Sequence, residues 1–261
     1  MCLILLAYEA HPKYRLILAA NRDEFYERPT KAADFWEEAP YILAGRDLKL
    51  GGTWLGMTRK GRLAAVTNYR DPKSFCINAK SRGMLVSRFL LKNAFAETYL
   101  RRVAKDKDAY NAFNLIAGDS SGLFCFSSRS DGIRPISPGI HGLSNRLLDT
   151  PWPKVSRGIR LFGEAIGGGK ERMEERLLWV LQDREQPPDA DLPDTGAGLE
   201  WERILSPIFI QSPTYGTRSS TVVLVERVGQ VVFVEQTFYP EGPSVRKGPL
   251  CRFVFDTHHP G

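Results

Sequence analysis

A cysteine at position 2 is the residue of this chain best placed to do chemistry. Cys2 follows Met1 and heads the apolar run Cys2–Tyr8. Because residue 2 is small, we expect Met1 to be removed, which would leave a thiol and a free α-amine on one residue. The reference pKa is about 7.7–8.0 for the amine and about 8.5 for the thiol, so Cys2 would hold a nucleophile beside a weak base. The alternative is a small buried residue at the start of a strand.

A second polar group, Asn21-Arg22-Asp23-Glu24, follows another apolar run at 15–20. The turn-like break at 11–13 predicts that the two runs form an antiparallel hairpin. The end of the second strand would then lie beside the start of the first, so that Arg22 lowers the pKa of the Cys2 thiol and Asp23 holds an amine. Adjacent residues on a strand face opposite sides, so we expect the chain to turn here if both reach Cys2. The alternative is a structural salt bridge at a loop entry.

Further along the chain, strand and helix signals come in blocks. Strand pairs are expected at 53–58 with 62–68, at 113–117 with 123–127 and at 220–226 with 230–238, before a last strand at 251–255. Apolar periodicity predicts a helix capped by Ser81 and further helices at 94–109, 155–166 and 171–181. The Pro-, Asp- and Gly-rich stretch 183–198 predicts a long loop. This order indicates an α+β fold with mostly antiparallel sheets, in one domain over residues 1–261.

The composition is that of an ordinary globular protein and argues against several classes of function. Hydrophobic residues make up 43% and charged residues 25%, and no apolar stretch approaches the length of a membrane span. The first apolar run lacks the flanks of a signal peptide, so a cytoplasmic location is expected. The four cysteines are scattered without a C-x-x-C pair, which argues against a disulfide framework and a metal site. The net charge is +6, but the basic residues alternate with acidic ones, so we expect no nucleic-acid partner.

Six motifs occur in a fixed order between Cys2 and about Val225, over most of the chain. They are Asn21-Arg22-Asp23-Glu24-Phe25, Gly51-Gly52-Thr53-Trp54-Leu55-Gly56, Val66-Thr67-Asn68, Ser81-Arg82-Gly83, Gly142-Leu143-Ser144-Asn145 and Tyr215-Gly216-Thr217-Arg218-Ser219-Ser220-Thr221. In these motifs the chain resembles the NRDE family, also called the transport and Golgi organisation protein 2 family. The resemblance implies an N-terminal-nucleophile hydrolase-like fold, a four-layer αββα sandwich with two mostly antiparallel sheets.

The resemblance also implies a distant likeness to choloylglycine hydrolases and penicillin V acylases. In those enzymes an N-terminal cysteine works with an arginine and an aspartate at the end of the second strand, later asparagines and a late arginine. Cys2, Arg22 and Asp23 match the first part of that pattern, although Arg22 and Asp23 are adjacent whereas the acylases space them by two residues. Asn145 and, less closely, Asn68 match the asparagines that stabilise an oxyanion. Arg218 matches the late arginine. The alternative for both asparagines is a turn-forming role at a strand end.

Two functions fit these residues, and in both the partner is a small molecule. The first is Cys2-dependent hydrolysis or acyl transfer on a linear amide or thioester, with no cofactor required, in a pocket expected near Trp36, Trp54 and Trp152. The second follows from the family's link to haem trafficking and to acyl-CoA or lipid homeostasis. It is a non-catalytic protein that carries haem or an acyl chain in the same cleft, with Cys2, His11 or His141 as the haem ligand.

Overall fold

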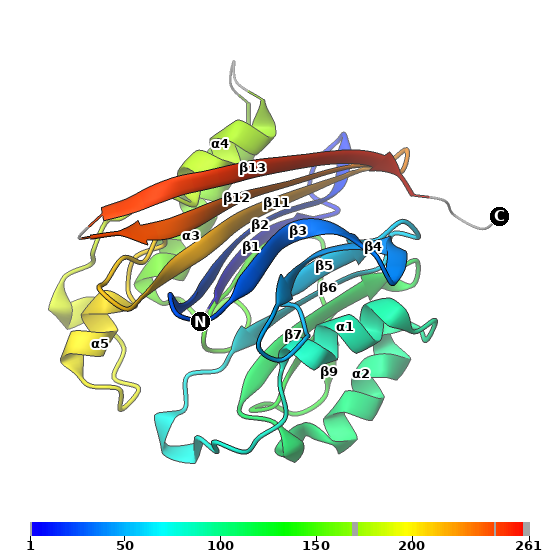
Figure 1. Cartoon of the computed structure of the whole chain (residues 1–261). Helices are drawn as coiled ribbons and strands as arrows, with labels where there is room; N and C mark the ends of the chain where they lie inside the picture. The colour runs from blue at the N-terminus through cyan, green and yellow to red at the C-terminus, as the bar shows by residue number, and fades with distance from the viewer. Residues whose placement is uncertain (1, 169–171, 243, 258–261) are drawn as a thin grey trace.

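Two antiparallel β-sheets lie face to face in the computed structural model, which describes residues 2–168, 172–242 and 244–257 (Figure 1). Met1, whose removal the sequence predicts, lies outside the described residues. The strands are β1 (Cys2–Tyr8), β2 (Tyr14–Phe25), β3 (Thr30–Trp36), β4 (Ala39–Asp47), β5 (Leu55–Thr58), β6 (Leu63–Asn68), β7 (Phe113–Asp119), β8 (Gly122–Ser127), β9 (Ile133–Pro135), β10 (Gly139–Leu143), β11 (Tyr215–Glu226), β12 (Gln230–Glu241) and β13 (Ser244–Asp256). The helices are α1 (Gly83–Leu91), α2 (Ala96–Lys105), α3 (Pro153–Ile166), α4 (Met173–Val180) and α5 (Leu199–Ile204).

The first sheet has the strand order β10-β1-β2-β11-β12-β13. Its central hairpin, β1 with β2, confirms the predicted pairing and places Cys2 opposite Arg22. The turn expected at Arg22 and Asp23 is wrong, because β2 stays extended as far as Phe25. Pairing with β11 explains this, since the register of that pair continues to Tyr215 opposite Phe25. β2 therefore runs past the start of β1.

The second sheet has the order β3-β4-β5-β6-β7-β8-β9. The predicted pairs β5 with β6 and β7 with β8 are confirmed, as is the pair β11 with β12 in the first sheet. β3 and β4 were not predicted. Charged residues interrupt the apolar pattern of β3, and its pairing with β4 shifts register twice. A pairing that slips in register has no strict alternation of apolar and polar residues for a sequence to show.

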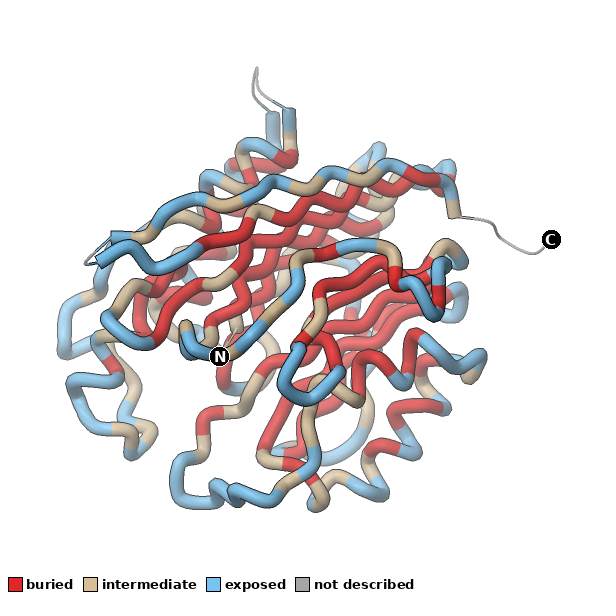
Figure 2. The backbone as a smooth tube through the Cα atoms, viewed as in Figure 1, coloured by how far each residue is buried: buried red, intermediate tan, exposed pale blue. Residues whose placement is uncertain are grey.

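Helices cover the outer face of each sheet, which gives the four-layer αββα sandwich expected from the sequence. One apolar cluster fills the space between the sheets and includes Ile4, Leu18 and Met57. α1 and α2 pack on the second sheet, and α3 and α4 pack on the first. Figure 2 shows the buried residues concentrated along the paired strands and on the inward sides of the helices. This layering follows from strand alternation, which sends side chains of each sheet to two separate cores.

The helix predictions hold in outline, with differences at the ends. Ser81 is not the cap of α1, because the N-cap residue is Arg82 and its side chain makes no capping bond. The predicted helix 171–181 is α4, and residue 171 lies outside the described residues. The predicted loop 183–198 contains only a short 3-10 turn at Asp189–Asp191, whereas α5 after it was not predicted. No helix in the described ranges combines the length and apolarity needed to cross a membrane.

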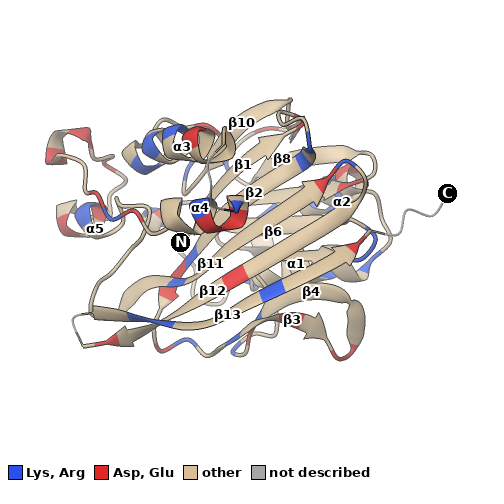
Figure 3. Cartoon of the chain, turned by 90° about the horizontal axis from the view of Figure 1, so that it is seen from above, with Lys and Arg blue, Asp and Glu red and all other residues tan. Residues whose placement is uncertain are grey.

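Charged residues gather on the helices and at the strand ends, with both signs side by side on α4 and near α5 (Figure 3). The Nη2 atom of Arg172 lies 2.5 Å from Oε1 of Glu175, and the Nη2 atom of Arg203 lies 2.5 Å from Oδ2 of Asp189. The alternation of basic and acidic residues in the sequence thus corresponds to local ion pairs.

Candidate active site

Cys2 begins β1 and faces the space between the two sheets. Ile4 and Leu6 on the same strand lie in the core between the sheets, and side chains two residues apart share a face. The side chain is only partly exposed. Burial raises the pKa of the Cys2 thiol, and the nearby Asp23 adds to this rise. A backbone hydrogen bond from Asp23 and the charge of Arg22 act in the opposite direction but do not outweigh burial. The predicted effect of Arg22, which lowers the pKa of the thiol, is confirmed, but it is smaller than the effect of burial.

Arg22 lies directly across from Cys2 on the same face of the sheet. Its guanidinium stacks on the Trp54 ring, with 4.2 Å from Cζ to the ring centre. Its Nη1 donates a hydrogen bond to the Thr30 hydroxyl at 3.0 Å. Two contacts from the second sheet therefore hold this buried cation beside the thiol.

Asp23 points to the other face of the sheet, one residue beyond the start of β1. Its Oδ1 accepts a hydrogen bond from the Thr217 hydroxyl at 2.8 Å. Burial raises the pKa of Asp23, and Lys154 opposes this more than any other charge. Because β2 continues beyond the start of β1, Asp23 reaches the Cys2 site around the first residue of β1. The turn that we expected from the sequence is not needed.

Cys2, Arg22 and Asp23 line one cleft of about 240 Å³ whose walls come from both sheets and from residues 75–83. Of the three predicted pocket tryptophans, Trp54 lines this cleft. A larger groove of about 520 Å³ lies between α3 and α4, but its lining includes no cysteine. The chemistry-bearing side chains therefore converge in the smaller cavity.

The other two tryptophans lie elsewhere, which corrects the prediction for them. Trp36 is buried under the helices of the second sheet, where its Nε1 donates to the Ala44 carbonyl at 3.1 Å. Trp152 lies beside the guanidinium of Arg70, with 4.9 Å from Cζ to the ring centre.

The mouth of the cleft combines apolar and cationic side chains. Phe75 and Ile77 are 68% and 86% exposed. Arg28, Lys80 and Arg82 also line the cleft, together with the acidic Glu24 and Asp47, which both pair with Arg28. Such a rim suits a ligand with an apolar part and a negative charge.

Close backbone contact between two glycines brings Arg82 into the site. A Cβ on Gly52 would lie 2.5 Å from the backbone carbon of Gly83, so no larger residue fits. The start of α1 thus packs directly on the loop before β5. Arg82 there donates to the Ala112 carbonyl at 3.1 Å, and burial lowers its pKa. The motif Ser81-Arg82-Gly83 was the sequence signal for this residue.

The two candidate asparagines take different positions. Asn68 lines the cleft. Asn145 is fully buried behind it, and its Nδ2 donates to the Asn68 backbone carbonyl at 2.9 Å. Ser144, beside Asn145, donates from its hydroxyl to the Cys2 carbonyl at 3.3 Å. Asn145 therefore holds the end of β6 in place, and Asn68 is the one of the two asparagines that lines the cleft.

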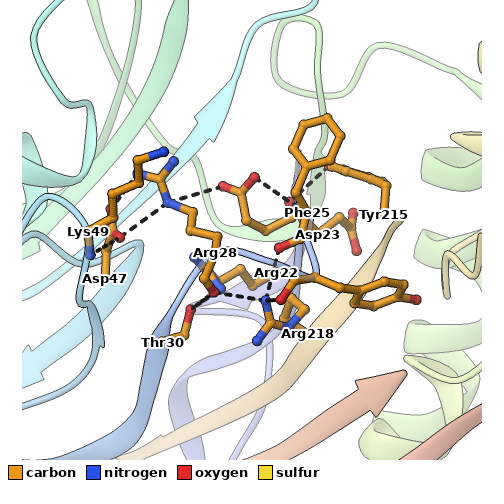
Figure 4. Close-up of polar contacts among 11 residues, drawn as sticks. Arg22, Asp23, Phe25, Arg28, Thr30, Asp47, Lys49, Tyr215 and Arg218 are labelled. Carbon is orange, nitrogen blue, oxygen red and sulfur yellow. Dashed lines mark hydrogen bonds and ion pairs between the residues drawn. The ribbon is translucent and has the colours of Figure 1, made fainter. Parts of the chain in front are cut away.

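Arg218 supports the loop after β2 and lies outside the cleft lining (Figure 4). The register of β11 with β2 shifts between Thr217 and Ser219, so Arg218 occupies a bulge. Its Nη1 donates to the carbonyls of Phe25, Tyr26 and Arg28 at 3.0, 3.1 and 3.0 Å. Arg218 acts on the site through the position of this loop.

The same loop carries Arg28, which reaches the second sheet. Its Nη2 and Nε lie 2.6 and 3.2 Å from the two carboxylate oxygens of Asp47 (Figure 4). A two-point contact of this kind fixes the orientation of both groups. It fastens the cleft wall formed by the loop after β2 to the end of β4.

Neither of the two histidines considered as haem ligands lines the cleft. His11 lies at the β1–β2 turn, the opposite end of the hairpin from Cys2, and its Nδ1 accepts the backbone N–H of Lys13 at 3.2 Å. Both ring nitrogens of His141 are engaged, by Asp149 at 2.7 Å and by the Ser137 carbonyl at 2.9 Å. Of the three residues proposed as haem ligands, Cys2 lines the cleft, and His11 and His141 lie outside its lining.

Lys154 is a buried lysine that the sequence did not predict at the site. Lys154, in the first turn of α3, is 3% exposed; burial lowers its pKa to about 8, and Asp23 and Cys2 oppose this lowering. Nothing in the stretch Trp152-Pro153-Lys154-Val155 separates it from an ordinary exposed lysine.

The chain is similar to known proteins over nearly its whole length. The family model described as Transport and Golgi organisation 2 matches residues 1–240. The transport and Golgi organization protein 2 homolog of Bos taurus is 40% identical, and the alignment covers 94% of this chain and 95% of the homolog. The homolog of Homo sapiens is also 40% identical, and that alignment covers 91% of this chain and 93% of the homolog. Among solved structures, the chain is similar to a mutant conjugated bile acid hydrolase from Clostridium perfringens. The alignment covers 100% of each chain, with a TM-score of 0.48 and 10% sequence identity. The chain belongs to the Transport and Golgi organisation 2 family.

Proposed function

We propose that this protein is a Cys2-dependent amidohydrolase or acyltransferase that acts on a linear amide or thioester. The observation that carries this proposal is the convergence of Cys2, Arg22 and Asp23 in one cleft, with Asn68 in its wall. A thiol, a cation, a carboxylate and an amide donor are the groups that acyl transfer requires.

The raised pKa of Cys2 sets a requirement on the mechanism. A buried thiol of this kind is protonated at neutral pH and is a weak nucleophile until a base accepts its proton. Removal of Met1 would supply that base, because the α-amine of Cys2 has a reference pKa of about 7.7–8.0. In this proposal Asp23, one residue beyond the start of β1, holds this amine.

The reaction then has two steps. The Cys2 sulfur attacks the substrate carbonyl as the thiol proton passes to the α-amine, and Asn68 donates a hydrogen bond to the resulting oxyanion. The carbonyl re-forms as the bond to the leaving amine or thiol breaks, and that group takes the proton from the α-ammonium. In the second step, water or another acceptor attacks the thioester and releases Cys2.

Intact-mass measurement tests this proposal. The protein is incubated with a panel of N-acyl amides and acyl thioesters and quenched in acid. We expect loss of Met1 and an acyl adduct on Cys2, both visible by mass, with the adduct absent from Cys2→Ala and present in Cys251→Ser, a control at another partly buried free cysteine. Retention of Met1, or adducts unaffected by Cys2→Ala, would exclude the mechanism.

A second function, binding without turnover, is favoured by the rim of the cleft. The exposed Phe75 and Ile77 suit the apolar part of an acyl-CoA or of haem as a transported ligand, and the cations Lys80 and Arg82 suit its charged groups. If this is the function, the wild type binds haem or an acyl-CoA saturably and releases the acyl-CoA unchanged, whereas Cys2→Ala keeps the binding of acyl-CoA and loses the thiolate ligand of haem. Hydrolysis of bound acyl-CoA by the wild type alone would instead support the enzyme.

A further inference from the structure

Two short loops at the mouth of the Cys2 cleft hold large apolar side chains in water. The loop between β4 and β5 exposes Leu48 and Leu50 by 57% and 50%, and the loop between β6 and α1 exposes Phe75 and Ile77 still further. Leu50, Phe75 and Ile77 all line the cleft, so the two loops share one rim. We call these four residues the rim patch. Large apolar side chains that gather on a surface mark an interaction site, whereas single scattered ones do not.

Hydrogen bonds fix the loop between β6 and α1 in its exposed position. Asn111 contacts Cys76 at two points, because its Nδ2 donates to the Cys76 carbonyl at 2.8 Å and its Oδ1 accepts the Cys76 N–H at 2.7 Å. At the start of the loop, Nη2 and Nε of Arg129 lie 2.6 and 2.9 Å from Oδ2 of Asp71. Figure 2 shows this segment as exposed, and residues 72–78 are all in that class. The loop therefore presents its apolar side chains to the outside in a fixed arrangement.

The loop between β4 and β5 is a tight turn that is fixed in the same way. The Asp47 carbonyl accepts the Gly51 N–H at 2.8 Å, and Oδ1 of Asp47 accepts the Lys49 N–H at 3.1 Å. Gly51 has a φ of +72°, a left-handed conformation that glycine adopts at little cost. The turn holds Leu48 and Leu50 in place on the other side of the rim.

Lysines surround the rim patch. Lys49 lies between the two leucines of the first loop, and Lys73 and Lys80 flank the apolar residues of the second. All three are exposed. Within the described ranges, the lysines that form ion pairs are Lys13 and Lys31, in other parts of the chain. The three lysines of the rim are thus available to a partner.

Acidic residues near the rim patch do not cancel this charge. Glu24 and Asp47, which line the cleft, both contact Arg28. Asp71, at the start of the second loop, contacts Arg129. The lysines therefore leave an excess of positive charge around an apolar surface.

We propose that the rim patch docks the protein on the surface of an anionic lipid bilayer, with the mouth of the Cys2 cleft against the lipid. The apolar side chains enter the boundary between headgroups and acyl chains, and the lysines meet the anionic headgroups. An acyl chain could then pass from the bilayer into the cleft without crossing water. Docking involves the rim alone and does not depend on whether Cys2 reacts.

Vesicle sedimentation tests the docking apart from any reaction. The vesicles contain ether-linked phosphatidylcholine, alone or mixed with ether-linked phosphatidylserine, because ether lipids offer no acyl bond that Cys2 could attack. We expect the full-length protein to sediment with the vesicles that contain phosphatidylserine, and we expect added salt to weaken this binding by screening the lysines. Failure to bind the anionic vesicles at low salt would overturn the proposal, whatever the outcome of the acylation experiment.

The apolar part of the rim is tested by the double variant Phe75→Ser with Ile77→Ser. Binding to the anionic vesicles should weaken by ~10-fold or more, because two large side chains no longer leave water. Trp179→Ser is the matched control, since Trp179 is 69% exposed but lies on α4, outside the first sheet. It should bind like the wild type. Equal losses in the two variants would show that the rim is not the docking surface.

The charged part is tested by replacing the three lysines of the rim with glutamine. Binding at low salt should weaken by about 10²-fold, from the usual contribution of a lysine near an anionic bilayer. The control has the same net charge but loses three exposed lysines elsewhere, Lys60, Lys92 and Lys105. Equal weakening in both would assign the binding to net charge and overturn the proposal.

A second copy of the chain is the other occupant that the rim patch could take. Sedimentation velocity without vesicles follows it. We expect the wild type and the variant with Phe75→Ser and Ile77→Ser to sediment as the same species. A dimer of the wild type that this variant disrupts would assign the rim patch to self-association and contradict docking on lipid.

Discussion

Replacing Lys154 with methionine should change how the stability of the protein depends on pH. The pKa of Lys154 is 10.5 when exposed and about 8 in the folded protein. The unfolded chain therefore binds more protons than the folded one between these values, and the stability contributed by this residue rises with pH across that interval. Methionine has a similar shape and no charge, so Lys154→Met removes this dependence.

The expected size follows from the same two values. The difference of 10.5 − 8 = 2.5 units corresponds to a burial penalty of ~3 kcal/mol at low pH, with 1.36 kcal/mol per unit. Most of this penalty disappears as the ammonium loses its proton. Between pH 7 and pH 10 the free energy of unfolding of the wild type should rise by about 2–3 kcal/mol relative to Lys154→Met.

Urea denaturation at pH 7, 8, 9 and 10 measures this difference directly. Other groups that titrate in the range are common to both proteins and cancel in the comparison. Lys154→Arg is the control, because arginine stays charged at pH 10 and should not show the rise. Near-ultraviolet circular dichroism checks that each variant keeps its packed core. Parallel pH profiles for wild type and Lys154→Met would show that the pKa of Lys154 is not lowered in the folded protein.

Three other predictions concern separate parts of the structure. Asn68→Ala should slow acylation of Cys2 by about 10²–10³-fold through the loss of an oxyanion donor, and single-turnover kinetics that show no change would assign that role elsewhere. Arg218→Ala should lower the free energy of unfolding by ~2 kcal/mol, because three carbonyls lose a shared charged donor; urea denaturation tests this, and an unchanged midpoint would contradict it. Burial raises the pKa of Glu235 above its ordinary value of 4.5, so the stability that this residue contributes is lost as pH rises through the raised value. From pH 4 to pH 8 the free energy of unfolding of Glu235→Gln should therefore rise relative to that of the wild type, by about 1 kcal/mol per unit of pKa shift. Urea denaturation at both pH values measures this, and a difference between variant and wild type that is the same at pH 4 and pH 8 would count against it.

The hairpin at the start of the chain shows what could be predicted from the sequence. Two apolar runs around a short turn determine an antiparallel pair, and the length of the turn sets the register that places Cys2 beside Arg22. Local signals of this kind also predicted the pairs β5 with β6 and β7 with β8. Each depends on residues close together in the chain.

The details of the site depend on contacts between distant segments, which local patterns do not contain. Asp23 reaches the cleft because β11 keeps β2 extended, so no turn is needed. Asn68 and Asn145 both end apolar strands in the sequence, and only the packing of the segment after β10 against β6 places one in front of the other. Lys154 is buried because α3 packs on the first sheet, a fact about tertiary structure.

The central claim is that Cys2 is an N-terminal nucleophile, and the most direct test is the intact mass of protein purified from its native host, before and after exposure to an acyl thioester. We expect the purified chain to lack Met1 and to gain one acyl group, and we expect no acyl group on Cys2→Ala. A chain that keeps Met1, or that gains no acyl group on Cys2 with any substrate of the panel, would contradict it.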